Sequence, residues 1–205
     1  DLLRLTSGQV TNEGVYKYYR WVERSFRENQ PYDEFATELL TATGSTFSNP
    51  AANFYRTSKD MNDCVETISQ VFLGARLQCA KCHNHPFERW TQDNYYGMAA
   101  FFNRVQRTNT KRVNEMFIYV SQSGEVTQPR TQQQMKPWVP GQGDIENPNE
   151  FDRRLDFASW LTKPGNPFFA KIEVNRIWSQ VFGRGIVEPA DDFRDTNPPS
   201  NAVLL

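Results

Sequence analysis

The feature that most constrains the fold is the recurrence of large apolar side chains every three or four residues. In residues 14–28, Tyr18, Trp21, Val22 and Phe26 follow this spacing, which places them on one face of a helix. The same pattern predicts helices over residues 31–43, 58–83, 92–103, 149–162 and 167–182. Aromatic residues make up 14% of the chain, so rings should dominate the core. We therefore expect a mainly α fold.

One stretch departs from the helical period. Residues 116–128 read MFIYVSQ, a Ser123-Gly124 turn and then EVTQ, which predicts a small β-hairpin. Residues 127–150 are polar and contain many Pro, Gly and Gln, which is typical of a long loop or linker. The expected organisation is a helical domain at 1–126, this linker, and at 151–205 the truncated start of a second, mainly helical domain.

Charge and hydropathy exclude some classes of partner. The formal net charge of −1 provides no broad positive field for nucleic acid or for an anionic membrane. No apolar run approaches the roughly 20 residues that cross a bilayer. The chain opens DLLRLTSGQV, without a Met or the apolar segment of a secretory signal, and ends abruptly at NPPSNAVLL. We expect a processed or excised part of a longer protein, and an assembly with the remainder.

The motif Cys79-Ala80-Lys81-Cys82-His83 has the C-x-x-C-H pattern of c-type haem attachment. On a helix, positions i, i+3 and i+4 share one face, so both thiols and the imidazole should project together. Two thioethers to the vinyl carbons would fix one edge of the macrocycle, and the imidazole would reach the iron. The sequence therefore predicts one covalent haem c, held through Cys79 and Cys82 with His83 as the proximal iron ligand.

Other uses of this motif are a redox dithiol, a disulfide and a zinc site. A thioredoxin-like dithiol would follow a strand and open a helix, whereas this motif is expected to close a long helix. A zinc site stays open, because Cys64, Cys79, Cys82 and either His83 or His85 would complete a Cys₃His set. As a lone thiol, Cys64 is expected to be a buried, small apolar side chain.

The sixth iron position is less constrained. His85 lies two residues from His83, a chain span of at most about 7 Å, so distal ligation is not expected. We expect a contact with a haem propionate, a hydrogen bond that orients an iron ligand, or a helix-end contact instead. Met98 on the following helix is a distal candidate, with core packing as the alternative. An open sixth position would instead permit small-molecule binding or peroxide chemistry.

Side chains around the motif are candidate haem contacts. Phe87 and Trp90 could wall the porphyrin, although ordinary core packing is the alternative. Arg76 and Arg89 are candidate partners of the haem propionates, because the guanidinium matches carboxylate geometry. Exposure at helix ends is the alternative for both arginines.

The segment FLGARLQCAKCHNHPFERWTQDNYYGMAAFF (72–102) resembles secreted cytochrome-type proteins abundant in planctomycetes. These carry paired uncharacterised domains, the first containing C-x-x-C-H-x-H-P-F-x-x-W. The similarity extends upstream through YRWVERSFRENQPYDEFATELLTATG and downstream into DRRLDFASWLTKPGNPFFAKIEVNRIWSQVFGRGIVEPADDFRDTNPPSN. The resemblance implies an exported, modular protein with haem c at Cys79 and Cys82 and with His83 axial. At the position of Gln128, many relatives are expected to have His, so this chain departs from the family pattern there.

These observations predict an extracytoplasmic c-type cytochrome that transfers single electrons, and they name no catalytic residue. Its partners would be redox proteins or other cytochrome modules. A periplasmic, cell-surface or secreted location follows, because haem c is attached outside the bacterial cytoplasmic membrane. The alternatives are a haem enzyme with an open distal site, such as a peroxidase or carbohydrate oxidase, and a zinc-stabilised structural or interaction module.

Overall fold

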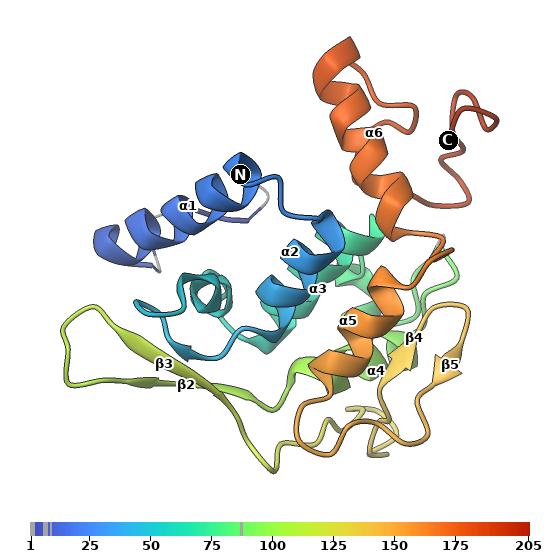
Figure 1. The fold of residues 1–205 in the computed structure, drawn as a ribbon. Coiled ribbons are helices and arrows are strands. Elements are labelled where there is room, and N and C mark those ends of the chain that lie inside the picture. The colour runs from blue at the N-terminus through green and yellow to red at the C-terminus, as the bar shows by residue number, and fades with distance from the viewer. Residues whose placement is uncertain (1–2, 6–7, 9, 87) are drawn as a thin grey trace.

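The computed structural model describes residues 3–5, 8, 10–86 and 88–205, and the fold is mainly α-helical with small antiparallel sheets (Figure 1). The α-helices are α1 (Asn12–Arg27), α2 (Tyr32–Thr41), α3 (Met61–Leu73), α4 (Gln92–Phe102), α5 (Arg154–Thr162) and α6 (Phe169–Phe182). Two 3₁₀ helices, η1 (Pro50–Arg56) and η2 (Gln78–Lys81), flank α3. None of the helices in these ranges combines the length and the apolar character needed to cross a membrane.

The predicted hairpin at 116–128 is wrong in its pairing. Strand β3 (Met116–Val120) pairs antiparallel with β2 (Val105–Asn109), and with β1 (Gly44–Ser45) on its other edge. Ile118 at the centre of β3 is fully buried, so the register is set by the face that meets the core. A second small sheet joins β4 (Trp138–Val139) to β5 (Gly143–Asp144), within the predicted linker.

The C-terminal segment shares the core of the N-terminal helices. From α5, Phe157 and Leu161 are fully buried in the same apolar cluster as α2, α3 and α4. Arg154 is also completely buried, and its guanidinium donates to the Ala42 carbonyl at 3.0 Å and pairs with Asp152 at 2.7 Å. Because the buried guanidinium of Arg154 has both of these partners, it fixes α5 against the end of α2. The proposed division into two domains stays a prediction.

Helix α3 ends well before the motif, which corrects the predicted helix over 58–83. Asp60 caps its N-terminus by accepting from the Asp63 amide at 2.9 Å. At the other end Gly74 adopts φ +59°, the left-handed conformation that commonly terminates helices. The apolar repeat continues past this glycine into Ala75, which explains why periodicity alone extended the helix. The motif therefore lies in a separate segment.

Candidate functional site

The motif forms one short helical turn of its own. Cys79 and Ala80 lie in η2, and Cys82 follows directly after it. The Cys79 carbonyl accepts from the Cys82 amide at 3.3 Å and from the His83 amide at 3.4 Å. Residues three apart in a 3₁₀ turn eclipse each other, so the backbone places the two cysteines on one side. The two cysteines therefore share one side of the turn without the long helix that we expected, and the predicted convergence of His83 with them stays a prediction.

Burial separates the reactive side chains from the anchoring ones. Cys79, Cys82 and His83 are exposed, and both cysteines are free thiols. Leu77 and Ala80 are at most 1% exposed and hold the turn against the core. The element before the turn is α3 rather than a strand, so the arrangement also differs from a thioredoxin-like site.

The imidazole of His83 has a defined tautomer. Its Nδ1 lies 2.7 Å from the Asn84 carbonyl oxygen, which can only accept, so Nδ1 carries the hydrogen. In the neutral ring this leaves the lone pair on Nε2, and His83 is exposed. A hydrogen bond from one ring nitrogen to a carbonyl commonly orients a metal-ligating histidine.

Helix α4 supports the motif from beneath. The Gln92 side chain donates to the Lys81 carbonyl at 3.0 Å, and the Tyr96 hydroxyl donates to the same carbonyl at 3.2 Å. The Gln92 amide donates to the Asn84 side chain at 3.0 Å, close to the start of the helix. Burial, and secondly the nearby Cys82 thiol, raise the pKa of the Tyr96 hydroxyl. Sequence reasoning missed these supports, although polar residues in a first helical turn are a usable signal.

Gln128 belongs to the same support. It is completely buried, and its Nε2 donates to the Gln92 and Asp93 side chains, each at 3.1 Å. Its Oε1 accepts from the amides of Arg130 and Thr131, each at 2.6 Å. Both polar ends are therefore satisfied. In this chain Gln128 therefore stabilises the start of α4, which holds the motif.

A pocket of about 220 Å³ adjoins the turn, and residues from two distant parts of the chain line it. The N-terminal part contributes Ala75, Arg76, Gln78, Cys79, His85, Glu88 and Trp90, and the C-terminal part contributes Asp192, Phe193 and Arg194. His85 donates its amide to the Trp90 carbonyl at 2.8 Å. Cys82 and His83 are not among the described residues that line this pocket. A full porphyrin is larger than this space, so the pocket could enclose only part of such a group.

The candidate haem contacts take different positions. Trp90 is buried and lines the pocket, and the Arg89 guanidinium stacks over its ring, 5.3 Å from the centroid. Arg76 forms an ion pair with Asp191 at 2.9 Å, which raises the pKa of the guanidinium. Phe87 lies outside the described residues.

Met98 is completely buried in the core cluster, among side chains of α3 and α4. It is not among the described residues that line the pocket beside the motif. The structure thus brings Arg76, Cys79 and Trp90 together and places Met98 in the interior.

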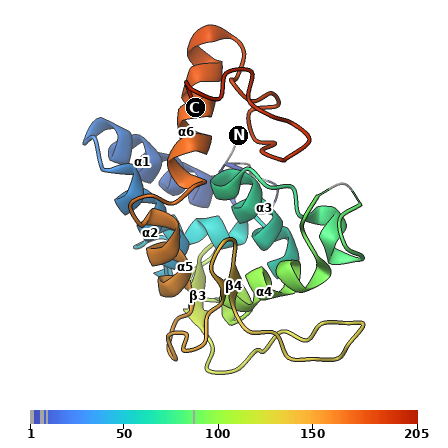
Figure 2. The ribbon, with the colours of Figure 1, turned by 90° about the vertical axis from the view of Figure 1, so that its right-hand side faces the viewer.

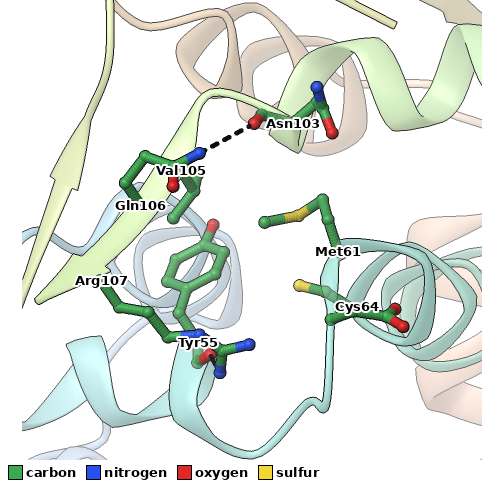
Figure 3. A pocket seen from close by; sticks show the side chains of 8 residues that line it. Tyr55, Met61, Cys64, Asn103, Val105, Gln106 and Arg107 are labelled. Carbon is green, nitrogen blue, oxygen red and sulfur yellow. Dashed lines mark hydrogen bonds between the residues drawn. The ribbon is translucent and has the colours of Figure 1, made fainter. Parts of the chain in front are cut away.

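The Cys₃His set of a zinc site is not assembled. In the described part of the chain, no three His, Cys, Asp or Glu side chains cluster as a metal site. Cys64 is 1% exposed and lines a different pocket of about 190 Å³, where its sulfur and that of Met61 point toward Tyr55 and Arg107 (Figure 3). Burial raises the pKa of the Cys64 thiol to about 12, so it remains protonated.

Haem c fits the donor set of the turn. Thioether formation requires two accessible thiols, and iron ligation requires an imidazole with a free ring nitrogen; the turn supplies all three. The two thiols and the ring emerge within five consecutive residues, as the covalent attachment requires.

Comparisons with known proteins identify the two parts of the chain. Residues 1–107 match the family PSCyt2, described as a protein of unknown function (DUF1549). Residues 153–205 match PSD1, described as a protein of unknown function (DUF1553). No curated protein and no solved structure matches the chain. Residues 153–205 thus resemble a second family, and because the first match spans more than half of the 205 residues, the chain belongs to the PSCyt2 family.

Proposed function

We propose that this protein is an extracytoplasmic c-type cytochrome with one covalent haem, which transfers single electrons to and from other redox proteins or cytochrome modules. The observation that carries the proposal is the turn at residues 79–83. It presents two exposed free thiols and an imidazole whose Nδ1 is hydrogen-bonded to the Asn84 carbonyl, which leaves Nε2 to ligate the iron. The resemblance to secreted planctomycete cytochromes supports the same proposal.

The protein residues would act by holding and tuning the group. Cys79 and Cys82 would keep it attached by thioethers although the adjoining pocket encloses only part of it. His83 would ligate the iron through Nε2, with the ring oriented by Asn84. The bound haem supplies a one-electron iron couple. Attachment of haem c outside the cytoplasmic membrane supports a periplasmic, cell-surface or secreted location.

The test is expression of the chain in a bacterium that carries the c-type maturation machinery, with export to the periplasm. We expect the intact mass to exceed that of the polypeptide by one haem. A pyridine haemochrome spectrum of the denatured protein should retain the visible bands of covalent haem. Replacing both Cys79 and Cys82 by Ser should abolish the added mass and the absorbance.

Cys64→Ala is the matched control, because it removes the remaining thiol of the chain, which is buried away from the turn. It should retain the haem at the same stoichiometry as the unmodified chain. A colourless wild-type product with the bare polypeptide mass would refute the proposal. Metal analysis of that product would then show whether the turn binds zinc.

A further inference from the structure

The C-terminal segment is fastened to both flanks of the motif. Residues 191–196, here called the strap, run beside the turns that follow α3, and Figure 2 shows this segment in red close to the green loop. On the near side, Asp191 accepts from Arg76 at 2.9 Å and also accepts from the Gln70 side chain. On the far side, Thr196 donates to Glu88 at 2.8 Å.

The centre of the strap meets the end of α3. The Phe193 amide donates to the Gly74 carbonyl at 2.8 Å. The contact is tight, because a Cβ built on Gly74 would lie 2.9 Å from Phe193 Cδ2 and 3.1 Å from Ile172 Cγ1. A larger residue at position 74 would therefore displace the strap or α6.

The residues that lead into the strap are held by a buried side chain whose hydrogen bonds are satisfied. Asn175 of α6 is completely buried, and its Nδ2 donates to the carbonyls of Val187 at 2.9 Å and Ala190 at 3.1 Å. Its Oδ1 accepts from the Val187 amide at 3.0 Å. From the same helix, Arg176 donates to the Gln70 carbonyl at 3.0 Å. The start of the strap is thus fixed relative to α6, and α6 relative to α3.

Of the two cysteines of the motif, Cys79 is the one that lines the described pocket beside the strap. Cys79 lines the same pocket as Asp192, Phe193 and Arg194, and it lies three residues after the strap-bound Arg76. Cys82 lies at the other end of the turn, on the side supported by α4 through the Lys81 carbonyl. The two ends of the motif therefore depend on different parts of the chain.

We infer that the strap is a positioning element for the Cys79 end of the motif, so that the site of the PSCyt2 region is completed by the PSD1 segment. Asp191, Phe193 and Thr196 act through Arg76, Gly74 and Glu88 rather than by touching the reacting groups. The expected effect on haem attachment rests on the proposed function. Loss of the strap contacts reduces thioether formation at Cys79 and does not change thioether formation at Cys82.

The first test uses the apoprotein and needs no haem. Hydrogen exchange followed by mass spectrometry is measured on peptides covering residues 74–83 and 92–102. Asp191→Ala and Phe193→Ala should each accelerate exchange in the first peptide by roughly tenfold and leave the second unchanged, because local opening is enough to release the strap. Asp195→Ala is the control, since it removes an exposed carboxylate from the same strap.

Thr196→Val is a milder variant in case the others unfold. It removes only the hydrogen bond to Glu88 and should accelerate exchange of the segment around residue 88. If exchange in residues 74–83 is the same in Asp191→Ala, Phe193→Ala and Asp195→Ala, and Thr196→Val has no effect near residue 88, the inference is overturned.

The second test uses chains matured with haem. Digestion and mass spectrometry should find a larger fraction of haem attached through Cys82 alone in Asp191→Ala and Phe193→Ala than in Asp195→Ala. Equal fractions in all variants would overturn the link between strap and attachment. Absence of haem from the wild-type chain would refute the proposed function, whereas the exchange test would still decide whether the strap positions the turn.

Discussion

Gly74→Ala tests the contact between the end of α3 and the strap. Gly74 has φ +59°, where a side chain costs about 1–2 kcal/mol. The new Cβ would also lie 2.9 Å from Phe193 and 3.1 Å from Ile172, which is buried and has little room to move. Overpacking of this kind costs about 1–3 kcal/mol. We therefore expect a total loss of about 2–5 kcal/mol in the free energy of unfolding.

Gly183→Ala is the matched control. Gly183 ends α6 with φ +76°, and nothing lies within 4 Å of a Cβ built there. It should therefore lose only the conformational part, about 1–2 kcal/mol. Urea unfolding followed by far-ultraviolet circular dichroism measures both losses as shifts of the midpoint at constant slope. If Gly74→Ala costs no more than Gly183→Ala, the packing contact with the strap is not what the structure indicates.

Three further substitutions test the support of the site and its surroundings. Met98→Leu should leave the visible and near-infrared spectrum of matured protein unchanged, because the side chain is completely buried in the core; loss of a near-infrared sulfur-to-iron band would contradict this. Gln128→Ala should cost about 2–4 kcal/mol in urea unfolding by leaving buried polar partners unpaired, and a loss below about 1 kcal/mol would contradict that bracing role. Burial opposes ionisation of Glu125, but hydrogen bonds from Arg153 and Arg104 outweigh it and lower its pKa to about 2. The stabilisation from ionised Glu125 should be complete above about pH 5 and be lost as the pH falls toward 2. Glu125→Gln should therefore reduce the loss of unfolding free energy between about pH 5 and pH 2. An unchanged acid dependence would contradict the ion pairs of Glu125 with Arg104 and Arg153.

Helical periodicity was sufficient to locate most of the helices, because apolar faces meet a shared core. Tyr18 and Trp21 of α1 lie inside, whereas Phe26, on the face predicted for the same helix, is exposed. In α6, Ile172 is buried but Ile177 is exposed. The predicted end of α3 was wrong, although the sequence contains a signal for the observed end. Gly74 stands inside the predicted helix, and a left-handed glycine is a common helix terminator.

Strand pairing was not predictable in the same way. The Ser123-Gly124 pair is a typical turn signal, yet β3 pairs with the preceding β2. In β2 only Val105 is buried, so the strand has no alternating pattern that would have marked it. Its identity depends on Ile118 of the partner strand facing the core, which is a tertiary property.

The candidate site likewise has a local part, which the sequence predicted, and a non-local part, which it did not. The ligand set is local, because the C-x-x-C-H residues occupy five consecutive positions and even a short 3₁₀ turn places the two cysteines on one side. The strap is non-local: Asp191 lies 115 residues from the Arg76 that it binds, and no spacing rule connects them. The coupling that we infer between the strap and the turn acts through its contacts at Gly74, Arg76 and Glu88. A chain that retains the motif but loses those contacts would keep the chemistry of the turn and lose the control of its Cys79 end.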